Sequence, residues 1–328
     1  MLNKALNLNQ DLFLEDTELK SGRDGFGDAI LKLGGAHPEI VVLSADLEES
    51  VRVSDFKKNF PDRFVEVGIA EQNMASIAAG MALSGMIPFI TSHAVFSPYG
   101  NWSQIRLSVC FSNANVKIVG SHSGFSNGPD GGSAESLEDV ALARVLPNLV
   151  VLSPIDYWQT RRAIEAAVKI NGPVYIRVCK EPTKQITTEK TPFEIGAGYV
   201  LAEGNDMTIF TTGVIAYEAL EAAKVLKAAH KVDAEVISLP TIKPIDKKII
   251  VDSAKKTGKC VSLEEHQINA GFGSAISEIL AEEFPVINRR IGVNDTFGES
   301  GSYKELKDKY QISAHHVINT ILRMLKEK

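Results

Sequence analysis

The chain has 328 residues, of which 44% are hydrophobic and 23% are charged, and its formal net charge is −6. These values are typical of a globular protein with room for two domains, and they give no general reason to expect nucleic-acid or membrane binding. Its three cysteines lack metal-ligand spacing, and the chain has no signal-like segment and no apolar run of about 20 residues, so we expect a reduced, cytoplasmic protein.

Short β-rich runs alternate with helical patterns along the first half of the chain, which predicts a parallel sheet covered by helices. The expected strands are 39–47, 63–68, 87–93, 115–122, 149–154 and 172–178, and the expected helices are 70–85 and 156–170. The segment 179–196 is polar and carries two prolines, so we expect it to be a domain linker that crosses the surface.

The same alternation of strand and helix patterns starts again beyond this segment. We expect strands at 206–213, 234–240 and 259–266 and helices at 214–230, 247–258 and 313–326. The sequence therefore predicts an α/β protein of two domains, each with a mostly parallel sheet covered by helices.

Four polar loops follow strands of the first domain, where open parallel sheets hold ligands: 44–50, 68–74, 92–100 and 121–136. No GxxxxGK[ST] motif or strand-linked GxGxxG motif is present, and no GDG precedes downstream asparagines. A metal-diphosphate site therefore cannot be assembled from this chain alone. Glu71 opens an otherwise apolar helix, either as a solvated first-turn acid or as a buried proton donor.

Several long stretches carry a resemblance. "GIAEQNMASIAAGMALSG", "SADL", "SHSGFSNGPDGG" and "GPVYIR" resemble the pyrimidine-binding domain of transketolase-family thiamine-diphosphate enzymes. "VSLEEHQINAGFGSAI" and "FGESGSYKELKDKY" resemble the family's C-terminal domain. The resemblance implies an N-terminal extension (1–20), a pyrimidine-binding domain (21–185) and a transketolase C-terminal domain (186–328). Because the diphosphate-binding half is missing, it also implies the C-terminal subunit of a split transketolase.

The resemblance implies thiamine diphosphate as cofactor, with Mg²⁺ or Ca²⁺ held by the partner subunit and no metal site in this chain. Glu71 would face N1′ of the aminopyrimidine as the catalytic activator. Phe96 and Tyr99 would supply an aromatic clamp, His93 stands where a further phenylalanine is expected, and Asp46 would lie near the cofactor.

For the substrate, the resemblance points to Arg23 and Ser50 at the far phosphate of a sugar phosphate, with Lys180 in place of an arginine. His122, also a catalytic candidate, and Asp130 would meet substrate hydroxyls near the reacting carbons. One departure is serious: the family usually carries a histidine four residues after this aspartate, where the chain has Ala134. Either Glu135 or a partner residue compensates, or the substrate differs from the usual ketose phosphates.

The expected activity is transfer of a two-carbon ketol unit from a ketose donor to an aldose acceptor. It would need an N-terminal transketolase subunit as partner and self-association into an assembly with two copies of each chain. Three alternatives stay open: a transketolase-like enzyme with a non-standard sugar donor, another thiamine-diphosphate half that uses a 2-oxo acid, and a non-catalytic assembly subunit. His266 is expected to be structural, and His315 and His316 to lie on the surface.

Overall fold

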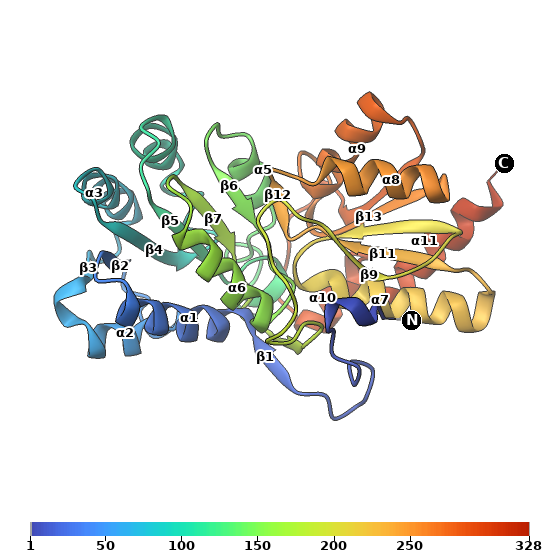
Figure 1. Ribbon diagram of the computed structural model, residues 1–328, viewed down its shortest axis with the longest axis horizontal. Coiled ribbons are helices and arrows are strands. Elements are labelled where there is room, and N and C mark those ends of the chain that lie inside the picture. The colour runs from blue at the N-terminus through green and yellow to red at the C-terminus, as the bar shows by residue number, and fades with distance from the viewer. Residues whose placement is uncertain (1, 328) are drawn as a thin grey trace.

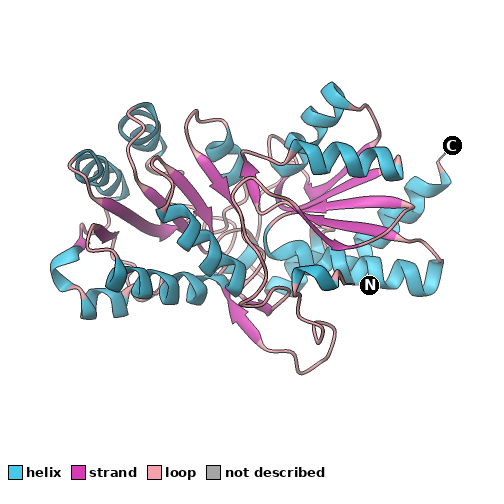
Figure 2. Cartoon of the chain, viewed as in Figure 1, coloured by secondary structure: helices cyan, strands magenta, loops and turns pink. Residues whose placement is uncertain are grey.

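The computed structural model describes residues 2–327, and Figure 1 shows two α/β domains side by side, with the first domain at the left. Figure 2 shows the strands of each domain enclosed between helices, so the predicted fold class is confirmed. Each strand and helix predicted above is present, with ends that differ by a few residues.

The first domain is built on a seven-stranded sheet with the order β12-β6-β7-β5-β4-β2-β3, in which all neighbours but β12 run parallel. The strands are β2 (Ile40–Ser44), β3 (Phe64–Glu66), β4 (Ile87–His93), β5 (Lys117–Ser121), β6 (Val150–Leu152), β7 (Val174–Arg177) and β12 (Thr241–Lys243). Strand β2 is buried along its whole length, as expected of a parallel strand covered on both faces.

Alternate residues of β2 pack against different helix layers. Ile40 and Val42 belong to one core cluster with α1 (Gly22–Ala36), α2 (Ser54–Asn59) and α6 (Tyr157–Val168). Val41 and Leu43 belong to another cluster with α3 (Glu71–Leu83), the π-helix η3 (Ile105–Phe111) and α5 (Asp139–Arg144). The short elements of this domain are α4 (Trp102–Gln104) and the 3₁₀ helices η2 (Pro61–Arg63) and η4 (Phe125–Asp130).

The second domain has a five-stranded sheet with the order β14-β13-β10-β11-β9, in which only β9 is antiparallel. Its strands are β9 (Tyr199–Ala202), β10 (Met207–Thr211), β11 (Ala234–Ser238), β13 (Cys260–Gln267) and β14 (Asn288–Val293). Its helices are α7 (Ala216–Val225), α8 (Lys247–Thr257), α9 (Phe272–Glu283), α10 (Tyr303–Lys309) and α11 (Ala314–Lys326), with η5 (Gly213–Ile215) and η6 (Leu226–His230) at the two ends of α7.

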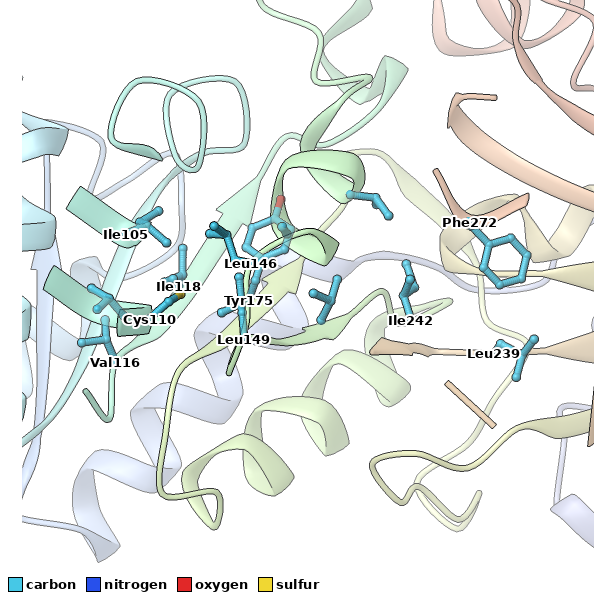
Figure 3. Packing of buried hydrophobic residues seen from close by; sticks show 14 of the residues in the cluster. Ile105, Cys110, Val116, Ile118, Leu146, Leu149, Tyr175, Leu239, Ile242 and Phe272 are labelled. Carbon is cyan, nitrogen blue, oxygen red and sulfur yellow. The ribbon is translucent and has the colours of Figure 1, made fainter. Parts of the chain in front are cut away.

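The two domains share a sheet and a core. Strand β12 comes from the second half of the chain but pairs antiparallel with β6 of the first sheet, through Thr241 opposite Leu152. One hydrophobic cluster continues across the boundary, and Figure 3 shows Leu149 and Tyr175 of the first domain in line with Ile242 and Phe272 of the second. The domains are therefore joined by main-chain hydrogen bonds as well as by packing.

The predicted surface linker is mostly exposed or partly exposed, but it is not free of the domains that it connects. Residues 182–184 form strand β8 (Pro182–Lys184), which pairs with β1 (Leu19–Ser21). Beyond it, Ile186 and Thr187 are buried, and the Thr187 hydroxyl donates to the buried Asp156 carboxylate over 2.6 Å. The segment therefore runs along the surface with part of its length anchored, because a threonine of this polar sequence finds a buried partner.

The start of the chain lies against the second domain, beside α7 and α10 in Figure 1. Leu2 forms an isolated bridge to Ala202, and η1 (Lys4–Leu6) follows it. The ring of Phe13 lies 6.5 Å from that of Tyr217. Within residues 2–327, no helix is long and apolar enough to cross a membrane.

Candidate active site

The predicted site residues gather at the carboxyl ends of neighbouring strands in the first sheet. His93 ends β4 and is paired in register with Ser121, the last residue of β5, which places His122 just beyond it. The loop after β2 carries Asp46 and Ser50, and α3 begins close by at Glu71. Parallel topology brings these ends to one edge, so the convergence follows from the strand order.

Glu71 is the first residue of α3 and is half-buried. Its Oε1 accepts a hydrogen bond of 3.2 Å from the Ser92 hydroxyl. Its main-chain carbonyl accepts one of 3.2 Å from Asn101, whose side chain is fully buried. No group among residues 2–327 donates to Oε2, so one carboxyl oxygen is fixed and the other remains free for a ligand.

Phe96 lies in the loop after β4, and its side chain is 42% exposed. An exposed aromatic face can stack on a flat ring, and a carboxyl oxygen without a protein partner can hydrogen-bond to a nitrogen of that ring. These residues therefore fit the aminopyrimidine of thiamine diphosphate.

Three aromatic side chains form a stack behind this exposed face. The ring of His93 lies 5.7 Å from Phe96 at an interplanar angle of 12° and 3.7 Å from His122 at 24°. His122 has a positive φ of 58°, an uncommon backbone conformation for a side-chain-bearing residue. The stack links the loops that follow β4 and β5.

Ser50 joins the two histidines. Its hydroxyl lies 3.0 Å from Nε2 of His93 and 3.2 Å from Nε2 of His122. Because a hydroxyl has one proton, Ser50 donates to one imidazole and accepts an N–H from the other. Nδ1 of His122 lies 3.0 Å from the Ser121 hydroxyl, so both nitrogens of this ring are engaged.

Positive charge surrounds this histidine pair. Burial, followed by the charge of Lys180, lowers the pKa of His93 to about 4, and Asp130 opposes the shift. Burial, His93 and Arg23 lower the pKa of His122 to about 2. Both rings are therefore neutral near pH 7 and act as hydrogen-bond partners.

Arg23 reaches the same place from α1. Its Nη1 donates to the Ser50 carbonyl over 3.0 Å, while its buried Nε has no hydrogen-bond partner. A hollow of about 510 Å³ is lined by Arg23, Ser50, Asp46 and Arg52, among others. A buried cationic donor without an acceptor beside an open hollow is the arrangement expected for anion binding. Here Asp46 is exposed, with a φ of 59°.

Tyr99 makes a different set of contacts from Phe96. Its hydroxyl donates to Oε2 of Glu138 over 2.7 Å and accepts from the Glu138 main-chain N–H over 2.6 Å. Burial, followed by the charge of Asp139, raises the pKa of this phenol. The hydroxyl of Tyr99 thus holds the start of α5.

The glycine-rich loop 121–136 packs against the second domain. A side chain at Gly132 would place its Cβ 2.3 Å from the Gly298 carbonyl oxygen, and one at Gly128 would lie 2.5 Å from the Gly301 carbonyl oxygen. The main-chain N–H of Gly301 donates to Gly128 over 3.1 Å. These glycines permit close backbone approach between the domains.

The departure at Ala134 sits in this loop, next to Glu135. The Glu135 carboxylate is 3% exposed, and neither of its oxygens has a hydrogen-bond partner. Burial and the charges of Glu265 and Glu299 raise its pKa to about 7.

A buried ionic network holds the end of the loop. Arg177 at the end of β7 donates from Nε to Asp139 over 2.8 Å and from Nη2 to the Glu265 carbonyl over 2.9 Å. Tyr175 donates to the same Asp139 oxygen over 2.7 Å.

His266 is buried beside this network. Its Nε2 accepts from the Ala141 N–H at 3.3 Å, so Nδ1 carries the proton and donates to the Gln267 carbonyl at 2.7 Å. Both ring nitrogens are therefore occupied inside the protein.

Three further residues at the site were not predicted: Ser92, Asn101 and Arg52. Ser92 and Asn101 hold Glu71, and Arg52 lines the same hollow as Arg23. Ser92 could have been found by strand alternation, since it precedes His93 and therefore points to the opposite face of β4. Within the described part of the chain, no group of three or more histidine, cysteine or acidic side chains could hold a metal ion.

Comparison with known proteins covers both domains. Residues 20–185 match the transketolase pyrimidine-binding domain, and residues 196–317 match the transketolase C-terminal domain. A putative transketolase C-terminal section from Methanocaldococcus jannaschii is 39% identical over 314 residues, which are 94% of this chain and 98% of that protein. A 6-deoxy-6-sulfo-D-fructose transketolase subunit from Clostridium sp. is 39% identical over 306 residues, which are 93% and 95% of the two chains.

A solved structure described as a split-gene transketolase in an inactive β4 tetramer has a TM-score of 0.85 and 41% identity to this chain. The match covers 92% of this chain and 97% of that one. The similarity therefore extends through both domains and nearly to both ends of the compared chains.

Proposed function

The chain belongs to the transketolase family, and we propose that it works as the pyrimidine-side subunit of a two-chain, thiamine-diphosphate-dependent transketolase. Its reaction would move a two-carbon ketol unit from an anionic ketose donor to an aldose acceptor. A separate N-terminal subunit would supply the diphosphate and metal site, which the sequence of this chain lacks.

The observation that carries this proposal is the position of Glu71. Oε1 is held by Ser92, Oε2 is free, and the exposed ring of Phe96 is available nearby to stack on a flat ligand. We propose that Oε2 shares a proton with N1′ of the aminopyrimidine, and that closure of the site by the partner removes Glu71 from water. When bound, thiamine diphosphate supplies the carbon nucleophile and the electron sink that cleavage of a ketose requires.

The remaining residues position the substrate. Arg23, Ser50 and Lys180 would hold its terminal anion, while Asp130 and His122 would contact hydroxyls near the reacting carbons. With its pKa lowered to about 2, His122 stays neutral, and it would orient the substrate by hydrogen bonding once its contact with Ser50 is released. A terminal sulfonate, as in the name of the Clostridium relative, presents the same anionic chemistry as a phosphate.

We propose that α3 and η3 form the surface that receives the N-terminal subunit. These two helices pack together at the left end of the molecule in Figure 1, away from the second domain. Exposed apolar side chains gather on and beside them: Ile69 is 82% exposed, Leu83 69%, Leu107 60% and Phe111 82%. The surface is continuous with the site, because α3 begins at Glu71.

The similar split-gene transketolase is described as an inactive tetramer, and this supports self-association as well. We propose that this chain also associates with itself and has no activity until the N-terminal subunit joins it. The enzyme would then contain both kinds of chain, with its active sites at their interfaces.

The decisive experiment reconstitutes the two chains with cofactor and compares Glu71→Ala and Glu71→Gln with the wild type. Loss of the proton-sharing group should reduce kcat by about 10²–10⁴-fold while the two-chain complex still assembles. Asp55→Ala removes another first-turn carboxylate, at the start of α2, and should leave the rate unchanged. An unchanged rate for the Glu71 variants would instead support a non-catalytic assembly subunit.

A further inference from the structure

His93 is expected to belong to an aromatic clamp, but its contacts also include a polar hydroxyl. Its Nε2 lies 3.0 Å from the Ser50 hydroxyl, and its ring stacks with those of Phe96 and His122. These contacts already engage the half-buried imidazole within the protein, whereas the ring of Phe96 is 42% exposed. Its hydrogen bond connects the edge of the imidazole to Ser50, which lines the same hollow as Arg23.

The groups around His93 share one chemical property. Arg23 and Lys180 are cationic, and their charges lower the pKa of His93 together with burial. Arg23 lines the hollow of about 510 Å³, and its buried Nε lacks an acceptor. Asp130, the acidic group whose charge acts on His93, is exposed, and its side chain accepts no hydrogen bond from residues 2–327. The local field therefore favours an incoming anion.

The hydroxyl of Ser50 couples His93 to that anion. A single proton on Oγ serves two imidazoles, so Ser50 can turn toward a ligand only if one of its contacts to His93 or His122 is given up. His93 then regains a free Nε2, which can bind the ligand as an N–H donor. No hydrogen bond holds its Nδ1 within the described chain, so the ring can adopt either tautomer.

We propose that His93 is a specificity-determining residue that recognises the terminal phosphate or sulfonate of the donor ketose, together with Ser50 and Arg23. This inference rests on the proposed function and names the substrate class of the same site. Phe96 remains the clamp, and His93 connects it to the anion through the ring stack. The residue thus binds the anionic end of the substrate, next to His122.

The test uses the reconstituted enzyme with D-xylulose 5-phosphate and D-xylulose as a pair of donors that differ in the anion alone. His93→Phe keeps the ring stack and removes the hydrogen bond. We expect its KM for the phosphorylated donor to rise at least tenfold, with kcat within threefold and KM for D-xylulose within twofold of the wild type. His93→Gln, which restores an amide N–H, should recover part of the loss, and His315→Phe, at an exposed position of α11, should change nothing.

A structural role would give another pattern, because a disturbed clamp would lower kcat and raise both KM values together. Equal changes for the two donors, or no change, would overturn the inference. The proposed function itself would be rejected if the reconstituted wild-type enzyme consumed neither donor and the Glu71→Gln enzyme were equally inactive.

A second measurement does not depend on turnover. Inorganic phosphate is titrated into the chain with ¹⁵N-labelled histidine, and the imidazole resonances are followed by NMR. The signals of His93 and His122 should shift in the wild type, and the phosphate affinity should fall at least tenfold in His93→Phe. Unchanged affinity in the variant would overturn the inference even in an inactive complex.

Discussion

Arg177 and Asp139 form an ion pair inside the protein, with Nε and Oδ2 separated by 2.8 Å and side-chain exposures of 6% and 0%. Removing one member leaves the other charge buried without its partner. We expect Arg177→Leu to reduce the free energy of unfolding by about 3–5 kcal/mol. Urea denaturation followed by circular dichroism measures this change.

An exposed pair provides the control. Arg52 and Asp24 are also 2.8 Å apart, but their side chains are 42% and 43% exposed. Solvent screens this pair, so Asp24→Asn should cost at most about 1 kcal/mol. Similar losses for the buried and the exposed pair would contradict the account of the buried network.

Glu135 should make stability depend on pH. Burial, Glu265 and Glu299 raise its pKa to about 7 from an ordinary value of 4.5, so between these pH values the folded chain holds a proton that the unfolded chain has lost. The contribution of this group to the free energy of unfolding is therefore fully present below pH 4.5 and falls as the pH rises to 7.

Glu135→Gln keeps the shape of the side chain and removes the charge. The variant should equal the wild type near pH 4.5 and become more stable above pH 7, by about 1–3 kcal/mol. Denaturation midpoints measured from pH 4.5 to 8 give the comparison. A difference that stays constant over this range would show that Glu135 titrates normally.

The contact between Glu135 and Gly298 should respond to a single methyl group. A Cβ at Gly298 would lie 1.4 Å from Oε2 of Glu135, so one side chain must move. We expect Gly298→Ala to cost about 1–3 kcal/mol, and less in a Glu135→Ala background. Gly80→Ala is the control, because a Cβ there meets nothing within 4 Å and favours the helix.

The exposed side chains of η3 should matter for assembly and not for folding. Phe111 is 82% exposed, so Phe111→Ser should leave the melting temperature of this chain unchanged. Binding of the N-terminal subunit should weaken by about 30-fold or more if the side chain is a central contact. Ile287→Ser, which changes a side chain 57% exposed in the second domain, should have no effect in the same titration. Unaltered binding by the Phe111 variant would place the interface elsewhere.

Much of the fold could be predicted because buried parallel strands have a strong local signature. The run 39–47 contains an almost continuous apolar stretch, and the structure has β2 there. Helix α1 was not predicted, and its sequence contains several glycines that lower helix propensity. Those glycines serve packing: a Cβ at Gly25 would lie 2.5 Å from the Tyr157 carbonyl oxygen on α6. Such long-range contacts leave no periodic pattern.

The candidate site was predictable to the level of the loop and not of the side-chain contact. The strand ends show that Ser50, His93 and His122 meet, since they follow neighbouring strands. The sequence alone does not show that one hydroxyl serves both imidazoles, or that the Tyr99 hydroxyl is bound to Glu138. These details depend on side-chain rotamers and on the left-handed backbone at His122.

Strand β12 has a consequence for motion. A hinge between the two halves would have to break the hydrogen bonds between β12 and β6 and also expose the cluster around Ile242. Rigid-body swinging of one half against the other is therefore blocked by the chain's own architecture. If the chain acts as proposed, substrate entry and product release would depend on movement of the loops at the edge of the sheet and of the partner subunit.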